Sequence, residues 1–317
     1  MNVENSSTLS KEWKDFTTRI PATIAVETSI LLLIALIAIG GNLLVVISIY
    51  CNPSLRTITN YFVLSLSLAN ILHPILGIPP SIFWSIQSRF TSQQGVCDFQ
   101  ASFFTSFIYV SVVTIILMAV NRFVCVCKHD KYKKIFNKKT SLLMLGSVWV
   151  ISFAGVPLYN EAGLNQTKAS FIPSQLRCGF LINKETTSKI LVNFIIAMTL
   201  LMPFTIITYC YYKVFKKIRE HKRNITPASN LNSLGAHVQD INVTWTMFAV
   251  LIGYFMTWMP VLIITLLKNI FGSANLPRQV HMIVTYTGSM STAVNPIIYG
   301  VMNASFRQEY KRIFRCT

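Results

Sequence analysis

An arginine at the end of a long apolar run is the residue of this sequence whose chemistry most requires a partner. Arg122 follows residues 98–121, in which the only strongly ionisable side chain is Asp98 at the far end. A guanidinium close to an apolar interior is costly unless an anion pairs with it. The order of the segments offers Asp240, which lies just before the apolar run 242–267. We therefore expect an ionic contact between Arg122 and Asp240 that holds two helices together.

Residue patterns typical of catalysis or metal binding are missing from the sequence. It contains no HExxH motif, no Walker loop and no GxSxG motif, and no apolar run holds a pair of carboxylates. The histidines are scattered, and His73, inside an apolar run, is more typical of hydrogen-bonded packing than of a metal ligand. We expect no enzyme, no metal site and no cofactor.

The elements that position Arg122 are apolar runs long enough to cross a membrane. Hydrophobic residues make up 52% of the 317 residues and charged residues only 12%, whereas about a quarter of a soluble domain is charged. The run from Cys97 to Arg122 would form a helix of about 37 Å, longer than a hydrocarbon core of about 30 Å. The pattern predicts an all-α fold, a seven-transmembrane helix bundle, with spans at about 28–50, 60–84, 98–121, 140–158, 187–212, 242–267 and 280–301.

Prolines modify two of these spans. Pro157 is expected to end the fourth span early, and Pro74, Pro79 and Pro80 to kink the second towards its outer end. Asn42 and Asn70 lie inside spans, where an unpaired amide is costly, so both are expected to face the bundle interior.

Lysine and arginine residues decide which end of the bundle faces the cytoplasm. With the N-terminus outside, most of the 28 lysine and arginine residues fall in the inner segments. Residues 1–27 lack the regions of a cleaved signal peptide, so the first span is expected to act as a signal anchor. We expect a multi-pass plasma-membrane protein with an extracellular N-terminus. We expect the basic residues behind its net charge of +17 to interact with the lipid bilayer and not with nucleic acid.

Two cysteines and two asparagines fall on the predicted outer side. Of the seven cysteines, only Cys97 and Cys178 lie in the oxidising compartment, so they can form a disulfide only with each other. Asn5 and Asn165 begin Asn-X-Ser/Thr motifs and are expected glycosylation sites. On the inner side Cys316 is a candidate for palmitoylation, with a reduced cysteine as the alternative.

The sequence is thus expected to form three parts. Residues 1–27 are the extracellular N-terminus, 28–301 the seven-span bundle, and 302–317 a short amphipathic C-terminal helix and tail on the inner membrane face. The tail offers almost no phosphorylatable residue, so arrestin, as a partner, would have to use the inner loops. The helix has an apolar face and basic positions elsewhere: Phe306, Tyr310, Ile313 and Phe314 share the face, and Arg307, Lys311 and Arg315 lie off it.

Short motifs occur in a fixed order along the seven spans. They are Gly41-Asn42, Leu66-Ser67-Leu68-Ala69-Asn70, Cys97, Asn121-Arg122-Phe123, Trp149 with Pro157, Pro203 with Tyr211, Phe255-Met256-Thr257-Trp258-Met259-Pro260, and Asn295-Pro296-Ile297-Ile298-Tyr299. This ordered set resembles the rhodopsin-like (class A) G-protein-coupled receptors over essentially the whole chain.

Within that family the cytoplasmic half is most similar to the melatonin receptors. The resemblance implies coupling to a heterotrimeric G protein, with the inhibitory Gi/o class as an analogy. It is carried by Asn121-Arg122-Phe123 in place of the commoner Asp-Arg-Tyr, Lys131-Tyr132, Lys139-Thr140-Ser141, Gln239-Asp240, Thr246-Met247-Phe248, Ile297-Ile298-Tyr299-Gly300, Asn303, Phe306-Arg307 and Glu309-Tyr310-Lys311-Arg312-Ile313.

The outer half departs from the melatonin receptors and from two other ligand classes. Thr199, Leu158 and Ile182 stand where melatonin receptors carry a histidine, an asparagine and a glutamine. Phe104 replaces the aspartate that amine receptors use, and Ser289 replaces the lysine that binds retinal in opsins. The resemblance therefore implies a ligand other than these amines or retinal.

The resemblance also assigns residues to an outer ligand cavity, although each of them taken singly also suits helix packing. The cavity is apolar with hydroxyl groups, which suits a small neutral molecule or the end of a peptide. Its residues are Phe104, Thr105, Ile108, Thr199, Trp258, Leu262, Thr265, Thr285 and Ser289.

By the same resemblance, activation breaks the expected Arg122–Asp240 contact. Pro260 lets the sixth helix swing, and Tyr211 and Tyr299 receive the freed Arg122. The switch is completed by Asn121, Trp258, Asn295 and Pro296, beside a polar core of Asn42, Asn70, Ser111 and Ser291.

Two residues depart from the family pattern in ways that bear on signalling. Asn70 replaces the usual aspartate, so we predict that sodium does not modulate agonist binding. Asp130 stands at an inner-loop position that is usually apolar and contacts Gα, so coupling is expected to be weakened or selective. A seven-span protein that binds ligand with weak or no coupling is the main alternative. A membrane transporter is the other, although the sequence has no inverted repeat of the kind transporters show.

Overall fold

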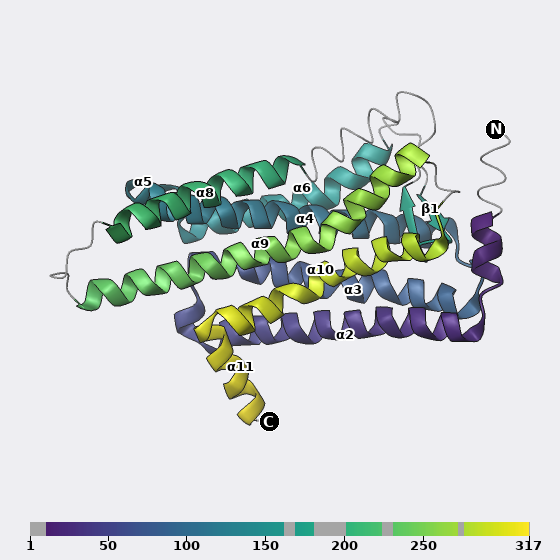
Figure 1. Ribbon diagram of the computed structural model, residues 1–317, viewed down its shortest axis with the longest axis horizontal. Helices are drawn as coiled ribbons and strands as arrows, with labels where there is room; N and C mark the ends of the chain where they lie inside the picture. Colours follow the sequence, from purple (N-terminus) through teal and green to yellow (C-terminus); the bar gives the residue numbers. More distant parts are fainter. Residues whose placement is uncertain (1–10, 162–168, 181–200, 224–230, 272–275, 317) are drawn as a thin grey trace.

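The computed structural model describes residues 11–161, 169–180, 201–223, 231–271 and 276–316. Inside the helices, the side chains of residues 156–161, 221–223, 231–241, 269–271 and 316 lie outside this description. Seven long helices run side by side through the described part of the chain (Figure 1). They are α2 (Pro21–Cys51), α3 (Ile58–Gln87), α4 (Gln94–Cys127), α6 (Lys138–Glu161), α8 (Met202–Arg223), α9 (Leu231–Phe271) and α10 (Arg278–Met302).

These helices confirm the predicted fold class, and each overlaps a predicted span. The predicted fifth span, 187–212, is described only from residue 201 onward. Within the described residues, four stretches are by themselves long and apolar enough to cross a membrane: Pro21–Cys51, Ile58–Gln87, Gln94–Cys127 and Asn242–Lys268.

Prolines do not end these helices. The expectation that the fourth span stops at Pro157 is wrong, because α6 continues to Glu161. In α3 the backbone also stays helical through Pro74, Pro79 and Pro80. Neighbouring helices in a membrane bundle can satisfy the backbone groups that a proline frees, so proline bends a spanning helix more readily than it ends it.

Helix α4 is the central element of the bundle. It packs against α3, α6, α8 and α9 and against the strands described below. Its buried side chains run along almost its whole length, from Cys97 to Val124. A displacement of α4 would therefore change the packing of most of the other helices.

One end of the bundle carries a β-hairpin, and we call it the hairpin end. Strands β1 (Ala169–Ile172) and β2 (Arg177–Phe180) are antiparallel, with Ala169 opposite Phe180 and Ile172 opposite Arg177. The first residues that the structure describes lie at the same end (Figure 1). Residues 11–17 are helical and form what we call the N-terminal roof.

Aromatic contacts hold the N-terminal roof against the hairpin. Phe16 is fully buried, with its ring centroid 5.4 Å from that of Phe171 in β1. The ring of Trp13 lies 5.8 Å from the same phenylalanine. The Oγ of Ser174 in the hairpin turn donates a hydrogen bond of 3.1 Å to Glu12. The roof thus covers part of the hairpin end.

A buried ionic cluster joins the chain just after the roof to three helices. The carboxylate of Glu27 in α2 pairs with Arg19, at 2.7 Å, and with Arg278 at the start of α10. Arg19 also donates to the backbone oxygen of Ser85 in α3, at 2.8 Å. Burial lowers the pKa of Arg19, and the adjacent Glu27 carboxylate opposes that shift. Two arginines on one carboxylate connect α2, α3 and α10 at this end.

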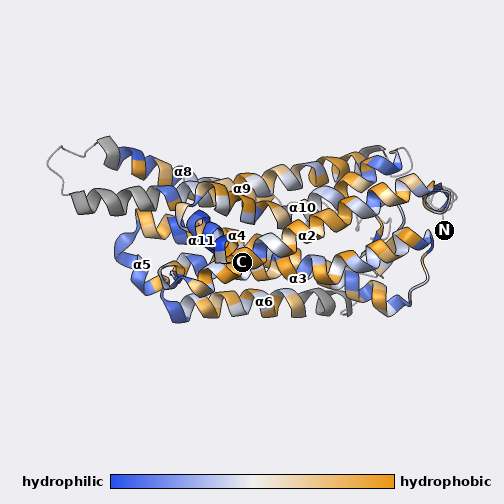
Figure 2. Ribbon diagram, turned by 90° about the horizontal axis from the view of Figure 1, so that it is seen from below, coloured by the Kyte–Doolittle hydropathy of each residue, from blue (hydrophilic) through white to orange (hydrophobic). Residues whose placement is uncertain are grey.

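The opposite end carries the short elements and most of the basic residues. It holds the 3-10 turn η1 (Pro53–Leu55), α5 (His129–Ile135) and α11 (Ala304–Cys316), and we call it the α11 end. Hydrophobic residues predominate along the middle of the bundle, whereas α5 and α11 are largely hydrophilic (Figure 2). This distribution fits a bundle whose middle lies in lipid.

Helix α11 is the C-terminal helix that the sequence predicts. Phe306 is fully buried and stacks on Tyr299 of α10, with ring centroids 5.5 Å apart. Arg307 and Lys311 are exposed. Glu309, on the buried side, accepts a 2.9 Å hydrogen bond from Asn52 at the end of α2. These contacts fix α11 to the bundle at an angle to the long helices (Figure 1).

Candidate ligand cavity and activation site

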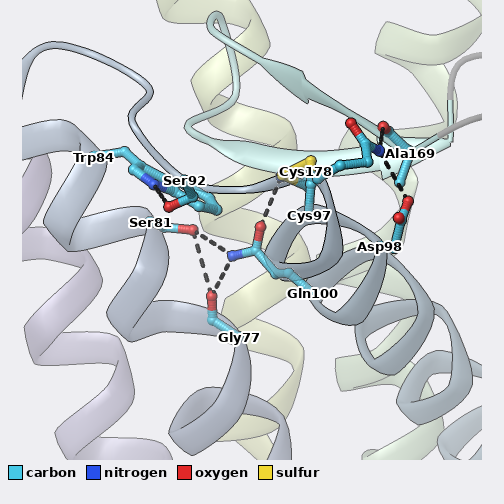
Figure 3. Close-up of a disulfide and its surroundings, with 10 residues drawn as sticks. Gly77, Ser81, Trp84, Ser92, Cys97, Asp98, Gln100, Ala169 and Cys178 are labelled. Atoms are coloured by element: carbon cyan, nitrogen blue, oxygen red, sulfur yellow. Dashed lines mark hydrogen bonds between the residues drawn. A yellow bond between two sulfur atoms is a disulfide. The ribbon is translucent and has the colours of Figure 1, made fainter.

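A disulfide fastens the hairpin to the start of α4, as the sequence predicts. Cys97 in α4 and Cys178 in β2 are bonded, with their Cα atoms 5.3 Å apart. Gln100, one turn further along α4, accepts a 2.7 Å hydrogen bond from the backbone N–H of Cys178 (Figure 3). Its amide nitrogen donates to Gly77 O at 2.7 Å and to Ser81 Oγ at 3.1 Å, both in α3. The sequence analysis did not identify Gln100, which joins the hairpin to two helices.

A small cavity lies in the middle of the bundle, between α3, α4, α9 and α10. It offers about 20 Å³ to the centre of a water molecule, enough for about one water. It brings together residues predicted for the ligand cavity with residues predicted for the polar core. Its lining is Leu66, Asn70, His73, Phe104, Phe107, Ile108, Ser111, Ile115, Tyr254, Trp258, Gly288, Ser291, Thr292 and Asn295.

Four of the lining side chains carry a buried polar atom without a hydrogen-bond partner. These atoms are Asn70 Nδ2, His73 Nδ1, Tyr254 Oη and Trp258 Nε1. A buried polar group normally has a partner, because leaving it unpaired costs about 1–3 kcal/mol. The cavity thus presents unused hydrogen-bonding capacity to whatever small polar group enters it.

The other residues predicted for the ligand cavity do not line this space. Thr105 and Thr265 donate hydrogen bonds to their own helices, at Ala101 O and Val261 O. Leu262 is half-buried and Ser289 is buried. Thr285 donates to the backbone oxygen of Gln175 in the hairpin turn, at 2.9 Å, and Thr199 lies outside the described residues.

Arg177 of the hairpin is a candidate ligand residue that the sequence analysis missed. Its guanidinium carbon lies 4.6 Å from the centroid of the Phe104 ring, which lines the cavity. The ring of His73 lies on Phe104 as well, with centroids 4.9 Å apart. Burial lowers the pKa of Arg177 to about 10, so it remains charged at neutral pH. One sequence signal could have identified it: Arg177 precedes Cys178, which the disulfide holds above α4.

The polar core connects α2 to α10. Asn42 is fully buried and donates to Ala38 O and to Thr292 O, both at 2.8 Å. The neighbouring Gly41 faces Pro296 so closely that a Cβ there would lie 2.6 Å from the proline Cγ. Helices α2 and α10 can therefore lie this close together because residue 41 has no side chain. The contact lies next to the predicted switch residues of α10.

Arg122 is buried at the α11 end of α4 and does not face lipid. Its Nη2 donates to the Oγ1 of Thr59 in α3. The same hydroxyl donates to Asn121 Oδ1 at 3.1 Å, and Asn121 Nδ2 lies 3.4 Å from the hydroxyl of Tyr132 in α5. The contact seen for Arg122 thus joins α4 to α3.

The residues predicted to act together with Arg122 lie in α8, α9 and α10. Asp240 belongs to α9, but its side chain lies outside the described residues, so the Arg122–Asp240 pair stays a prediction. Tyr211 is buried in α8, close enough to Arg122 for an electrostatic interaction. Tyr299 is fully buried, and its hydroxyl has no hydrogen-bond partner. Pro260 lies inside α9, which remains helical on both sides of it.

Three predicted modification sites cannot be placed. Asn5 and Asn165 lie outside the described residues, and so does the side chain of Cys316 at the end of α11. Among the described residues, no group of His, Cys, Asp and Glu side chains could hold a metal ion.

Comparisons with known proteins agree with this architecture. Residues 41–299 match the family described as 7 transmembrane receptor (rhodopsin family). The crystal structure of squid rhodopsin superposes with a TM-score of 0.81 at 18% identity, over 96% of this chain and 84% of that one, which shows a shared fold.

Receptors from several animals are similar to the chain over most of its length. Melatonin receptor type 1A of Gallus gallus is 27% identical, with 93% of this chain and 82% of the relative covered. Octopamine receptor beta-2R of Chilo suppressalis is 27% identical (92% and 80% covered), and the histamine H2 receptor of Canis lupus familiaris is 25% identical (93% and 81% covered). With the family match extending over most of the sequence, the chain belongs to the rhodopsin family of seven-transmembrane receptors, the class A G-protein-coupled receptors, and is similar to the melatonin receptors.

Proposed function

We propose that this protein is a plasma-membrane receptor that binds an extracellular ligand at the hairpin end and activates a heterotrimeric G protein at the α11 end. The sidedness is supported by two observations. A disulfide at the hairpin end suits an oxidising compartment. The basic residues around α5 and α11 suit the cytoplasmic leaflet. The N-terminus is then extracellular.

The ligand class is narrowed by the residues at two positions. Phe104, half-buried in α4, offers no carboxylate to an amine, and Ser289 in α10 offers no amine to retinal. Although relatives include an octopamine and a histamine receptor, an amine ligand held by a carboxylate at the position of Phe104 does not fit this chain. The departures at Thr199, Leu158 and Ile182 argue in the same way against melatonin.

The observation that carries the proposal is the shared cavity. Phe104 and Ile108, expected to meet the ligand, line the same space as Trp258 and Asn295, expected to belong to the switch. A ligand that displaces Trp258 therefore acts on α9 and α10 together. Interiors are close-packed, so a small displacement there is passed on to the helices rather than absorbed.

At the other end, the proposed switch is the release of Arg122. In the arrangement described, Arg122 is bonded to Thr59, whereas Tyr299 has a free hydroxyl that can accept the guanidinium after α9 moves. An agonist needs only a higher affinity for the open arrangement, and each factor of ten corresponds to about 1.4 kcal/mol. The opened end would receive the C-terminal helix of a Gα subunit, a helix-in-groove contact.

The similarity to melatonin receptors favours the Gi/o class of G protein, and arrestin binding would use the inner loops. The alternative, a ligand-binding protein with weak coupling, is supported by one residue. Asp130, exposed in the first turn of α5, places a carboxylate where an apolar contact with Gα is expected.

A G-protein activation screen in cells tests the proposal. The receptor is exposed to indoles, lipids, peptides and organic acids, and nucleotide exchange on each class of Gα is recorded. Active compounds should fail on Arg122→Ala at equal surface expression and succeed on Arg89→Ala, which removes an exposed arginine at the hairpin end. Activation that survives Arg122→Ala contradicts the switch. A receptor that reaches the surface but activates no G protein contradicts the proposal and favours the weak-coupling alternative.

A further inference from the structure

The hairpin end of the bundle holds a half-buried cation, Arg177, that forms no ion pair with any carboxylate among the residues that the structure describes. The side chain of Arg177 turns from β2 onto the Phe104 ring, with the guanidinium carbon 4.6 Å from the ring centroid. Its Nε donates a 3.1 Å hydrogen bond to Gln175 Oε1, a neutral group. The ion pairs found among the described residues involve Arg19, Arg278 and Arg312 but not Arg177.

A second cation lies close to the first. Lys268, half-buried near the hairpin end of α9, is within electrostatic reach of Arg177, and their like charges repel. Glu12 of the N-terminal roof offsets Lys268 in part, and it also accepts a hydrogen bond from Ser174. Of the described charged groups that act on Lys268, Glu12 is the one anion, so these described groups together remain positively charged.

A polar atom without a hydrogen-bond partner among the described residues belongs to His73, which lines the cavity. The His73 ring contacts the Phe104 ring, with ring centroids 4.9 Å apart, and the atom without a partner is its Nδ1. Although it is only 4% exposed, His73 lines the cavity. As the Nδ1–H tautomer it offers a hydrogen-bond donor to an incoming acceptor.

We propose that the ligand of this receptor is an organic anion, whose carboxylate or similar acidic group pairs with Arg177 while its apolar body turns the Phe104 ring aside and enters the cavity towards Trp258. The inference rests on the ligand site of the proposed function and specifies its chemistry. In an amine receptor, a carboxylate at this position of α4 binds a cationic ligand. Here the position carries the Phe104 ring, and the Arg177 guanidinium covers that ring, so the site is suited to an anionic ligand. Arginine is suited to this role because its planar fork binds carboxylates through two parallel hydrogen bonds.

A structural role for Arg177 predicts something different. If the cation–π contact with Phe104 only stabilised the hairpin, loss of the guanidinium would lower the thermal stability of the free receptor and leave ligand preference unchanged. If the guanidinium binds an anion, its loss changes which compounds bind. The two roles therefore differ in the relative affinity for carboxylates and their amides, which the stability of the free receptor does not set.

The experiment measures compound binding to the purified full-length receptor in lipid nanodiscs, without G protein. The probes are three matched sets on the same apolar bodies: indole-3-acetate, indole-3-acetamide and tryptamine; naphthalene-2-acetate with its amide and amine; and 3-phenylpropionate with its amide and amine. Binding is followed as the rise in melting temperature over a concentration series. The absence of G protein makes this result independent of whether the receptor couples.

We expect at least one carboxylate to bind about ten times more tightly than its amide, the scale of a charge-assisted hydrogen bond. Arg177→Gln should abolish this preference, Arg177→Lys should keep part of it, and Arg89→Gln, at an exposed arginine of the same end, should leave it intact. Three results would each overturn the proposal: amides or amines that bind as well as the carboxylates, no binding by any carboxylate, or a preference that survives in Arg177→Gln. If Arg177→Gln does not fold, Arg177→Lys decides the test: a preference for carboxylates that is weaker than in the unmodified receptor supports the proposal, and a preference of equal size overturns it.

Discussion

Loss of the Thr59 hydroxyl should activate the receptor without any ligand. Thr59 Oγ1 accepts a hydrogen bond from Arg122 and donates one to Asn121, and the threonine is buried at the junction of α3 and α4. In the proposed mechanism the bond to Arg122 exists in the resting arrangement and is lost when the guanidinium moves towards Tyr211 and Tyr299. Thr59→Ala therefore destabilises the resting arrangement selectively.

The size of the effect follows from the kind of bond that is removed. A hydrogen bond to a charged group contributes about 1.5–3 kcal/mol, and about 1.4 kcal/mol corresponds to a factor of ten in an equilibrium constant. The ratio of active to resting receptor should therefore rise about 10- to 150-fold. If about 1% of the unliganded receptor is active, within the usual range for a minor state, the lower limit already brings this fraction to about 10%.

The assay is nucleotide exchange on purified Gα by receptor in nanodiscs, without ligand, normalised to the amount of receptor. Thr59→Ser retains the hydroxyl and should behave like the unmodified receptor. Thr287→Ala removes a hydroxyl that bonds only to its own helix, at Ile283 O, and serves as the matched control. Basal exchange that is equal in Thr59→Ala and Thr59→Ser would refute the assignment of this bond to the resting arrangement.

Three further substitutions or conditions test other parts of the structure. Gln100→Leu leaves the buried N–H of Cys178 without its acceptor, so the receptor should lose about 1–3 kcal/mol of stability and melt several degrees lower; an unchanged melting temperature would mean that the hairpin does not depend on this contact. Asp130→Leu should raise agonist-driven exchange at equal surface expression if the exposed carboxylate weakens the Gα contact, and exchange that stays the same counts against that reading. Because Asn70 leaves the cavity without a carboxylate, sodium chloride and N-methylglucamine chloride at equal ionic strength should give the same agonist affinity, whereas Asn70→Asp should introduce a sodium-dependent difference; a sodium effect in the unmodified receptor would contradict the reasoning.

The sequence predicts the large-scale features because they depend on averages and local patterns. Seven apolar runs, the outer cysteine pair and the amphipathic α11 each follow from hydropathy, charge balance or helical period. The predicted end at Pro157 fails for a physical reason: a membrane helix has no water to compete for its backbone groups, so α6 remains helical beyond a proline that would end many soluble helices.

The site could be predicted only in part, because its decisive contacts join segments far apart in the sequence. Phe104 and Trp258 occupy positions that the family pattern marks, but the guanidinium of Arg177 contacts Phe104 because the hairpin is folded over α4, to which the disulfide bonds it. Gln100 and Thr59 are ordinary polar residues in their own helices. Their importance comes from Cys178 and from Arg122, partners that no local pattern specifies.

The N-terminal roof has a consequence for how quickly a ligand can arrive. Phe16 is fully buried against the hairpin, and the chain just after it is held by Arg19 and Glu27, so the described part of the chain covers the hairpin at this point. A compound that enters through the N-terminal roof has to wait until this covering lifts. We expect such a compound to associate more slowly than a ligand whose site is open, because a conformational change that binding requires lowers the association rate constant. Brief exposures would then underestimate affinity, and a true agonist would reveal itself through slow onset and long residence.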